Sequence, residues 1–209
     1  MQGLINTNLN PMIFQRLKTG IEVSDTDFDA IYSKRIKEVS EFHFTPLEVA
    51  KIAARFLVEK SGAKILDVGS GAGKFCMIGA TCTNGYFTGV EQRESLYALS
   101  KKLSNHYQLS NLTFIHSNII EIGFKAFDAI YFFNAFHENI VQSDPIDDSI
   151  KLDWRLYDKY SRHMKEQLDS MPVGTRLATY FSYLDEVPDS YKIQSTSFDC
   201  KLKLWKKTV

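Results

Sequence analysis

A glycine-rich turn follows a short apolar segment that ends in an acid. Asp67 closes this segment, and Gly69, Gly71 and Gly73 follow at every second position. Glycine adopts the positive φ angles of tight turns and lets the backbone approach a ligand closely, because it has no Cβ. The spacing differs from the dinucleotide pattern G-x-G-x-x-G, since Lys74 occupies the place of the last glycine. The turn therefore predicts a nucleotide-like cofactor site and disfavours a dinucleotide as its ligand.

Three further polar side chains stand at or directly after the ends of the next predicted strands. These are Glu91, Asn118 and Asn134. In an open α/β sheet, ligands bind beyond the carboxyl ends of the strands, near the point where the strand order reverses. We therefore expect these side chains to lie beside the glycine-rich turn.

Strand and helix patterns alternate from residue 64 onward. This alternation predicts a mostly parallel sheet with helices on both faces. Alternating patterns near the end of the chain predict an antiparallel hairpin around Phe198-Asp199. The predicted strands are 65–68, 86–90, 112–116, 127–133, 176–181, 191–197 and 200–206, and the predicted helices are 75–81, 95–107 and a long one ending near Leu168.

Helical patterns also precede the first strand. Residues 12–18 predict one or two turns, and Ser24 predicts the start of a helix that continues to Val39. In the next helix, Thr45 is expected as the N-cap and Glu48 as its capping-box partner.

These patterns divide the chain into residues 1–45, a helical extension, and residues 46–209, the main domain. His43 and Phe44 stand at the end of the extension. We expect them to cover the cofactor as a lid.

Composition narrows the classes of partner and location. The chain has 209 residues, with 25 basic and 25 acidic side chains, so no net charge attracts nucleic acid or an anionic membrane. We therefore expect no nucleic-acid partner. No apolar run approaches the roughly 20 residues of a membrane span, and the first residues lack a secretion-signal pattern. We expect a cytoplasmic protein with reduced cysteines and no metal site, because the three cysteines lack ligand spacing.

The segment from Asp67 to Gly73, an acid followed two residues later by G-x-G-x-G, resembles the first motif of the class I S-adenosylmethionine-dependent methyltransferases. The resemblance implies an α/β fold with a Rossmann-like, seven-stranded, mostly parallel sheet, a C-terminal antiparallel hairpin and helices on both faces. It also implies S-adenosyl-L-methionine as the cofactor.

The resemblance implies a place for each part of this cofactor. Asp67 and the glycine-rich turn would face its amino-acid end, Glu91 its ribose hydroxyls, and Asn118 and Ile119 its adenine. Asn118 stands where the family commonly has Asp, and its amide oxygen can accept the same hydrogen bond without charge. The expected cofactor-binding residues are Asp67, Gly69, Ser70, Gly71, Gly73, Glu91, Gln92, Asn118, Ile119 and Asn134.

Asn134 stands where amino methyltransferases carry an Asn/Asp-Pro-Pro-aromatic motif, although both prolines are missing. Its amide oxygen could accept a hydrogen bond from a substrate amine. His137 or Glu138 could act as a general base, or both could be a solvated pair at the start of a loop. The expected catalytic residues are Asn134, Phe136 and His137.

Residues 45–136 are also distantly similar to the core of the non-SET histone-lysine methyltransferases. The similarity lies in Thr45-Pro46-Leu47-Glu48, in the glycine-rich turn, in Gly89-Val90-Glu91 and in the strand ending at Asn134. The basic substrate-binding extensions of that family are absent. The resemblance therefore implies structural kinship and not a histone substrate.

The predicted activity is methyl transfer from S-adenosylmethionine to a nitrogen or oxygen acceptor, either a protein side-chain amine or a small molecule. One alternative is aminopropyl transfer, which needs an acidic pocket for a polyamine. The acids of the loop after the fourth predicted strand do not predict such a pocket, because Asp144, Asp147 and Asp148 are expected to be surface or helix-capping residues. Another is a non-catalytic S-adenosylmethionine-binding partner subunit. A nicotinamide-dependent reductase is disfavoured by Lys74 and the hairpin. The acceptor and the oligomeric state stay open.

Overall fold

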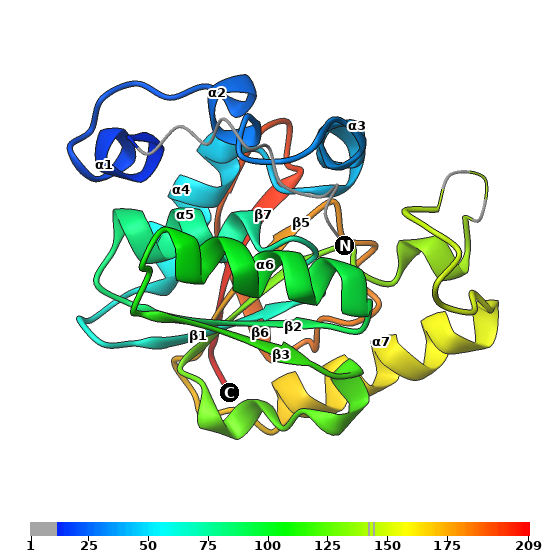
Figure 1. The fold of residues 1–209 in the computed structure, drawn as a ribbon. Helices are drawn as coiled ribbons and strands as arrows, with labels where there is room; N and C mark the ends of the chain where they lie inside the picture. Colours follow the sequence, from blue (N-terminus) through cyan, green and yellow to red (C-terminus); the bar gives the residue numbers. More distant parts are fainter. Residues whose placement is uncertain (1–11, 142, 144) are drawn as a thin grey trace.

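A seven-stranded sheet forms the centre of the protein in the computed structural model, which describes residues 12–141, 143 and 145–209 (Figure 1). Strands β1 to β5 are parallel, and β7 runs antiparallel to both β5 and β6. The order is β3-β2-β1-β4-β5-β7-β6, with β1 at Lys64–Val68, β2 at Tyr86–Glu91, β3 at Leu112–His116, β4 at Ala129–Phe133, β5 at Arg176–Tyr180, β6 at Tyr191–Ser197 and β7 at Leu202–Lys207. This sheet confirms the predicted fold class and its C-terminal hairpin.

The strand order reverses between β1 and β4. The chain moves outward from β1 to β2 and β3, then crosses back so that β4 pairs with the other side of β1. Val68, the last residue of β1, is the partner of Val90 on one side and of Phe132 on the other. The carboxyl ends of β1, β2 and β4 therefore meet at the reversal point, where open α/β sheets bind ligands.

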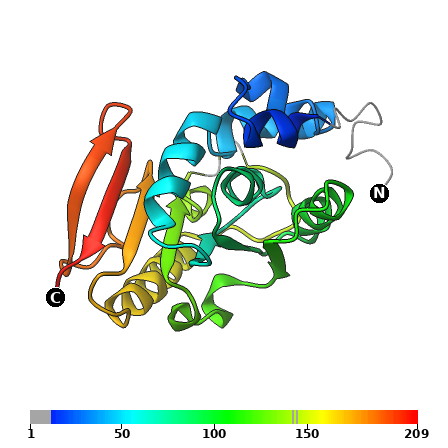
Figure 2. The same cartoon turned by 90° about the vertical axis from the view of Figure 1, so that its left-hand side faces the viewer.

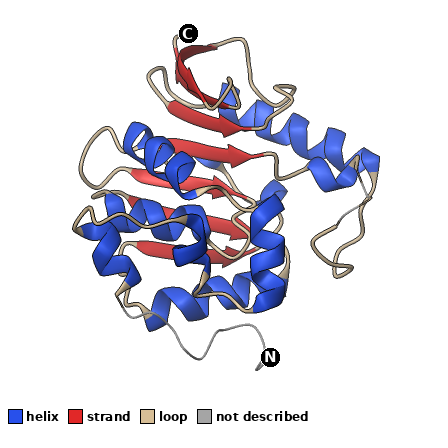
Figure 3. Ribbon diagram, turned by 90° about the horizontal axis from the view of Figure 1, so that it is seen from above, coloured by secondary structure: helices blue, strands red, loops and turns tan. Residues whose placement is uncertain are grey.

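Two apolar layers cover the sheet, because alternate residues of each strand point to opposite faces. Ile65 packs in the layer formed with α4 (Leu47–Leu57), α5 (Lys74–Cys82) and α6 (Glu94–His106). Its neighbour Leu66 packs in the other layer with α7 (Trp154–Asp169). Figure 2 shows α7 on the opposite side of the sheet from α4, and Figure 3 shows the strands side by side beneath the helices.

The N-terminal extension contains more helices than expected. The described part has α1 (Ile13–Lys18), α2 (Asp25–Asp29) and α3 (Lys34–His43) before α4. Ser24 does start α2, and it forms a capping box with Asp27. The single helix predicted from Ser24 to Val39 is wrong, because the chain turns after α2 and places Tyr32 in the core with no exposed surface.

The predicted capping of α4 is also wrong. Pro46 is the N-cap residue, and the hydroxyl of Thr45 is buried in a 2.8 Å hydrogen bond with the Tyr131 hydroxyl. The backbone N–H of Leu47 instead donates to Oδ1 of Asp25 at 2.9 Å. A carboxylate from α2 thus caps α4, because tertiary packing turns Thr45 toward the sheet and brings an acid to the positive end of the helix.

Residues 1–11 and Asp144, to which some of the predictions refer, lie outside the described residues. Within the described part, each helix is too short or too polar to span a bilayer.

Candidate functional site

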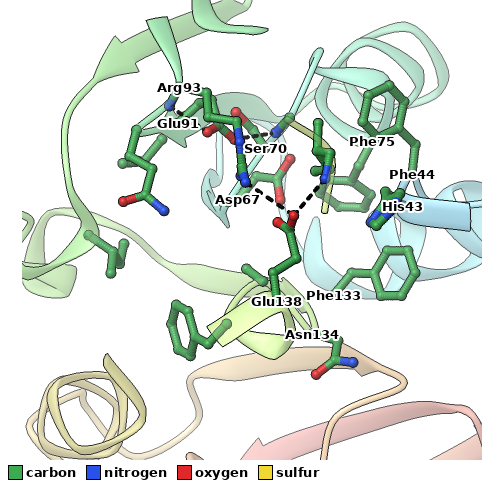
Figure 4. Close-up of a pocket in the computed structure, with 18 of the residues that line it drawn as sticks. His43, Phe44, Asp67, Ser70, Phe75, Glu91, Arg93, Phe133, Asn134 and Glu138 are labelled. Carbon is green, nitrogen blue, oxygen red and sulfur yellow. Dashed lines mark hydrogen bonds and ion pairs between the residues drawn. The ribbon is translucent and has the colours of Figure 1, made fainter. Parts of the chain in front are cut away.

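A pocket opens at the carboxyl ends of β1, β2 and β4 (Figure 4). Every residue predicted to bind the cofactor or to take part in catalysis lines it, with the exception of Gly73. The pocket also has a wall from the N-terminal extension, made by the segment from Phe42 to Thr45. The site thus gathers residues that are distant in sequence, from the N-terminal extension to α7.

The glycine-rich turn has the backbone that its sequence predicts. Gly69, Gly71 and Gly73 have φ angles of 74°, 54° and 81°. A Cβ on Gly71 would stand 2.9 Å from the ring of Phe44, which packs on the turn from the extension. At Gly73, the N-cap residue of α5, a Cβ would meet the Phe114 ring at 2.4 Å. Gly73 is thus the one predicted site residue outside the pocket lining, and the absence of its side chain serves the packing of α5 on β3.

Glu91 ties the turn to the end of β2. Its Oε2 accepts a hydrogen bond from the N–H of Gly71 at 2.9 Å, and its Oε1 accepts one from the N–H of Arg93 at 2.7 Å. Burial raises the pKa of the Glu91 carboxyl, although these donors oppose the shift. A carboxylate has about four acceptor positions, so roughly two stay open toward the pocket.

Asp67 lies at the floor of the pocket and is 3% exposed. Burial raises its pKa to about 7, while a hydrogen bond from the Cys76 thiol, with Sγ 3.2 Å from Oδ2, opposes the shift. The charge of Glu91 raises the pKa further. This carboxyl group is therefore poised to ionise when a cation approaches.

Asn118, Gln92 and Ile119 form the end of the pocket beyond Glu91. The amide nitrogen of Asn118 donates to Gln92 Oε1 at 3.1 Å and to the Tyr160 hydroxyl at 2.9 Å. Its amide oxygen accepts from the N–H of Ile120 at 3.2 Å. One acceptor position of that oxygen is thus used by the protein, and a second position is left for a ligand.

The segment after β4 closes the other end. Asn134 has a φ of 40° and lines the pocket. Phe136 is buried, with its ring 5.5 Å from that of Tyr160. Nδ1 of His137 lies 3.3 Å from the Tyr183 hydroxyl, and burial lowers the pKa of this imidazole. His137 is therefore held largely neutral at neutral pH, as a general base requires.

Arg93 holds the loop after β4 against β2, a contact that the sequence did not predict. Its guanidinium, 4% exposed, lies 3.1 Å from Oε1 of Glu138 and 2.9 Å from Oδ1 of Asp147. Figure 4 shows Glu138 reaching across the pocket toward Arg93. Glu138 is thus not part of a solvated pair, and Asp147 is not the surface acid that we expected, whereas Asp148 is exposed. An arginine two residues after the acid that ends β2 carries no local signal of this pairing.

Lys74 joins the extension to the turn. Its ammonium is buried, 2.7 Å from Oδ1 of Asp25 and 2.8 Å from Oδ1 of Asp29. In the sequence, Lys74 is notable only as the residue that breaks the dinucleotide pattern. His43 and Phe44 line the pocket where the predicted lid would lie.

Comparison with known proteins identifies the class. Residues 59–196 match a family described as a methyltransferase domain. A tRNA (guanine-N(7)-)-methyltransferase from Prochlorococcus marinus (strain NATL2A) is 35% identical over 88 residues, which cover 41% of this chain and 40% of that protein. The chain therefore matches about two fifths of the length of this relative.

Solved structures share the fold at low identity. An RNA methyltransferase from Salinibacter ruber, in complex with S-adenosyl-L-homocysteine, is 15% identical with a TM-score of 0.54, and the match covers 79% of this chain and 92% of that chain. TrmN from Thermus thermophilus is 13% identical with a TM-score of 0.54, over 84% of this chain and 53% of that chain.

The chain belongs to the methyltransferase domain family. The fold that it shares with the Salinibacter ruber methyltransferase is the one that the resemblance to class I S-adenosylmethionine-dependent methyltransferases implies.

Proposed function

We propose that this chain methylates a nitrogen or oxygen atom of a small-molecule acceptor that enters between the end of α3 and the loops after β4 and β5. One observation carries the proposal. A single pocket joins the glycine-rich turn and Glu91 to Asn134 and His137. A donor held at the first pair of features would therefore present its methyl group to an acceptor held at the second pair.

The residues at the donor end fit S-adenosylmethionine. The hydroxyl oxygen of Ser70 is buried and makes no hydrogen bond to the described residues, and it lies in the pocket lining. Buried polar atoms are rarely left without a partner, which favours a ligand at this position. We assign the open acceptor positions of Glu91 to the ribose hydroxyls, and Asp67 and the turn to the charged amino-acid end.

At the far end, Asn118 and Ile119 would hold the adenine. The remaining acceptor position of the Asn118 oxygen would receive the adenine amine, as the family resemblance implies. Tyr160 and Gln92 hold this amide in place through the hydrogen bonds to its nitrogen. The adenine contact therefore depends on residues that fix the orientation of Asn118.

S-adenosylmethionine supplies an activated methyl group on a sulfonium. The protein's own residues align the acceptor, exclude water and receive a proton. Phe133 and Phe136 form apolar walls, Asn134 offers an amide to orient the acceptor, and His137 offers a neutral imidazole. Residues 12–45 would act as the cover of this site, because Phe44 packs on Gly71 and Lys74 pairs with α2.

Calorimetric titration tests the donor assignment. We expect S-adenosylmethionine and S-adenosylhomocysteine to bind and NADH not to bind. Glu91→Gln should weaken donor binding at least tenfold, because hydrogen bonds to a charged acceptor contribute about 1.5–3 kcal/mol each. Glu94→Gln, an exposed acid in the first turn of α6, is the matched control and should change nothing. Binding of NADH alone, or equal donor affinity in Glu91→Gln, would contradict the assignment.

A nucleic-acid acceptor is the second candidate, because the 35% identical relative acts, by its name, on tRNA. The zero net charge predicts the opposite. Methylation of bulk tRNA, measured with a labelled methyl donor, separates the two candidates. Transfer of label to tRNA would replace the small-molecule proposal.

Aminopropyl transfer is not favoured by the charges of the loop after β4. Glu138 and Asp147 are both ion-paired with Arg93, so neither is a free carboxylate for a polyamine.

A further inference from the structure

The acceptor end of the pocket is surrounded by rings. We call the set Phe42, His43, Phe133, His137, Phe181 and Tyr183 the aromatic mouth. Four of its members line the pocket, and the other two contact them: the Phe181 ring lies 6.2 Å from that of Phe133, and the Tyr183 ring 5.7 Å from that of His137. Figure 4 shows His43 and Phe133 on one side of the pocket.

Several of these rings are exposed to solvent. Phe42 is 69% exposed, Phe181 45% and Tyr183 53%. Large aromatic side chains gathered at a pocket entrance mark a surface that buries an apolar ligand. The exposed rings therefore indicate an acceptor with apolar faces.

Backbone strain occurs in the same place. Phe133 of β4 is the register partner of Tyr180 of β5, so Asn134 and Phe181 follow adjacent strand ends. Both are non-glycine residues at positive φ, 40° and 52°. A phenylalanine in this region is a steric outlier, and such residues concentrate at functional sites. The two strained positions therefore lie beside the aromatic mouth, at the ends of β4 and β5.

The charges at the aromatic mouth do not suit a cationic acceptor. Glu138 pairs with Arg93, Asp25 pairs with Lys74, and Asp185 accepts a hydrogen bond from the Tyr157 hydroxyl. Glu186 accepts one from the Ser182 hydroxyl, and burial raises the pKa of its carboxyl, which favours the neutral form. A lysine ammonium, that of Lys201, lies 5.1 Å over the Phe181 ring. Aromatic rings beside a resident cation favour a neutral or anionic planar molecule over an aliphatic ammonium.

His137 supplies a base in this setting. The Tyr183 hydroxyl lies 3.3 Å from its Nδ1, and the two rings are tilted at 37° to each other. These contacts restrain the imidazole and leave Nε2 as the second functional nitrogen. His43 and Glu138 are the other titratable groups that act on His137, and burial outweighs the charge of Glu138.

From these observations we infer that the acceptor is a small planar aromatic molecule with an ionisable hydroxyl group. It stacks in the aromatic mouth, and His137, positioned by Tyr183, takes its hydroxyl proton. This inference rests on the proposed function.

The step balances without a further reactant. The hydroxyl O–H bond breaks, its proton goes to the imidazole, and the electron pair stays on oxygen. That oxygen forms its bond to the methyl carbon while the carbon–sulfur bond breaks and its electron pair stays on sulfur. The imidazolium then releases its proton to solvent.

A binding experiment tests the inference without turnover. The full chain is saturated with S-adenosylhomocysteine and titrated with 2-naphthol, whose ionisation is visible in its absorbance, and with Nα-acetyl-lysine amide. We expect 2-naphthol to bind and to ionise at a lower pH than it does in water. We expect the lysine derivative to bind at least tenfold more weakly.

Variants separate stacking from proton transfer. Tyr183→Leu should weaken 2-naphthol binding about three- to tenfold, the effect of one stacked ring. Tyr86→Leu, an equally exposed tyrosine at the start of β2, is the matched control and should change nothing. Tyr183→Phe should retain affinity while reducing the shift in naphthol ionisation, and His137→Gln should abolish that shift.

Stronger binding of the lysine derivative, or an ionisation shift that survives His137→Gln, would overturn the inference. S-adenosylhomocysteine affinity, measured separately in each variant, shows whether the site has folded. If that ligand fails to bind the unmutated chain, the donor assignment fails; if it binds and 2-naphthol does not, only the aromatic acceptor fails.

Discussion

The donor end and the acceptor end of the pocket are made in different ways. The donor end is backbone: three glycines at positive φ, and a carboxylate that accepts from the N–H groups of Gly71 and Arg93. The acceptor end is side chains from three segments, the end of α3 and the loops after β4 and β5. Strained non-glycine residues stand there in place of glycines.

This difference follows from what each end must recognise. A fixed cofactor is bound well by a backbone turn, which cannot vary without losing its shape. An acceptor is selected by rings and by one base, which can change while the sheet stays the same. Substitutions at the donor end should therefore impair cofactor binding. Substitutions at the acceptor end should leave the protein folded but change its affinity for the acceptor.

The largest expected effect on ligand affinity is that of Gly71→Ala. The new Cβ would stand 2.9 Å from the Phe44 ring, at a φ of 54° that alanine disfavours. We expect S-adenosylhomocysteine affinity, measured by calorimetry, to fall at least a hundredfold, because the turn and the covering ring must both move.

Gly20→Ala is the control for strain without a clash. Gly20 has a φ of 75°, and among the described residues other than its two chain neighbours, none has an atom within 4 Å of the place that a Cβ would take. Alanine there should cost about 1–2 kcal/mol of stability and leave donor affinity unchanged. Donor binding by Gly71→Ala at the native level would show that the donor end is not defined by its backbone.

Lys74→Met tests how the extension is attached to the donor end. Removing the ammonium leaves Asp29, 14% exposed in its side chain, without its cation, so we expect a loss of about 3–5 kcal/mol in the free energy of unfolding. Denaturant titration measures it. The double variant Lys74→Met/Asp29→Asn should recover part of this loss.

Lys51→Met is the matched control. Lys51 also makes a 2.7 Å ion pair, with Glu48, whose side chain is 64% exposed. Surface pairs contribute about 0–1 kcal/mol, so this variant should be nearly neutral. Equal losses in the two lysine variants would mean that burial does not distinguish the pairs.

The sequence predicted the sheet, the hairpin and the glycine-rich turn because their signals are local. Alternation of apolar residues identifies strands, and glycines at every second position identify the turn. Eleven of the twelve predicted site residues line the pocket, since parallel strands bring their carboxyl ends to one edge. Gly73 is the exception, because the same spacing that marks the turn also includes the residue that begins α5.

The contacts that the sequence did not predict are long-range side-chain pairs. Lys74 pairs with acids of α2, and Arg93 with acids of the loop after β4. Thr45 fits the capping-box pattern, yet its hydroxyl turns to Tyr131 and Asp25 caps the helix. Such pairings depend on how helices pack on the sheet, and no residue spacing along the chain encodes that packing.

The pH dependence of stability tests the buried acid of the donor end. The pKa of Asp67 is raised to about 7 from a usual value of 3.8, so between these values the folded protein holds a proton that the unfolded chain has released. Stability should therefore fall as the pH rises from about 4 to about 7 and then level off. The contribution is on the order of 4 kcal/mol at most.

Asp67→Asn isolates this contribution, because Glu91, whose pKa is also raised, stays in place. Thermal unfolding without ligand should show a shallower decline between pH 4 and 7 in the variant. Parallel curves for the two proteins would mean that Asp67 ionises normally in the folded state.

The smallest expected effect on stability concerns the hydrogen bond between Thr45 and Tyr131, which lies between the two ends of the pocket. Thr45 follows His43 and Phe44, which we propose cover the site, and its hydrogen bond to Tyr131 ties this segment to β4. Thr45→Val keeps the shape but leaves the buried Tyr131 hydroxyl without its partner, which should cost about 1–3 kcal/mol. Thr45→Ser keeps the hydroxyl and should cost less. We expect Thr45→Val also to lower donor affinity, because the Phe44 ring would no longer be held in its position over Gly71. If Thr45 instead acted as the N-cap of α4, valine would lower the stability of the helix and leave donor affinity at the native level.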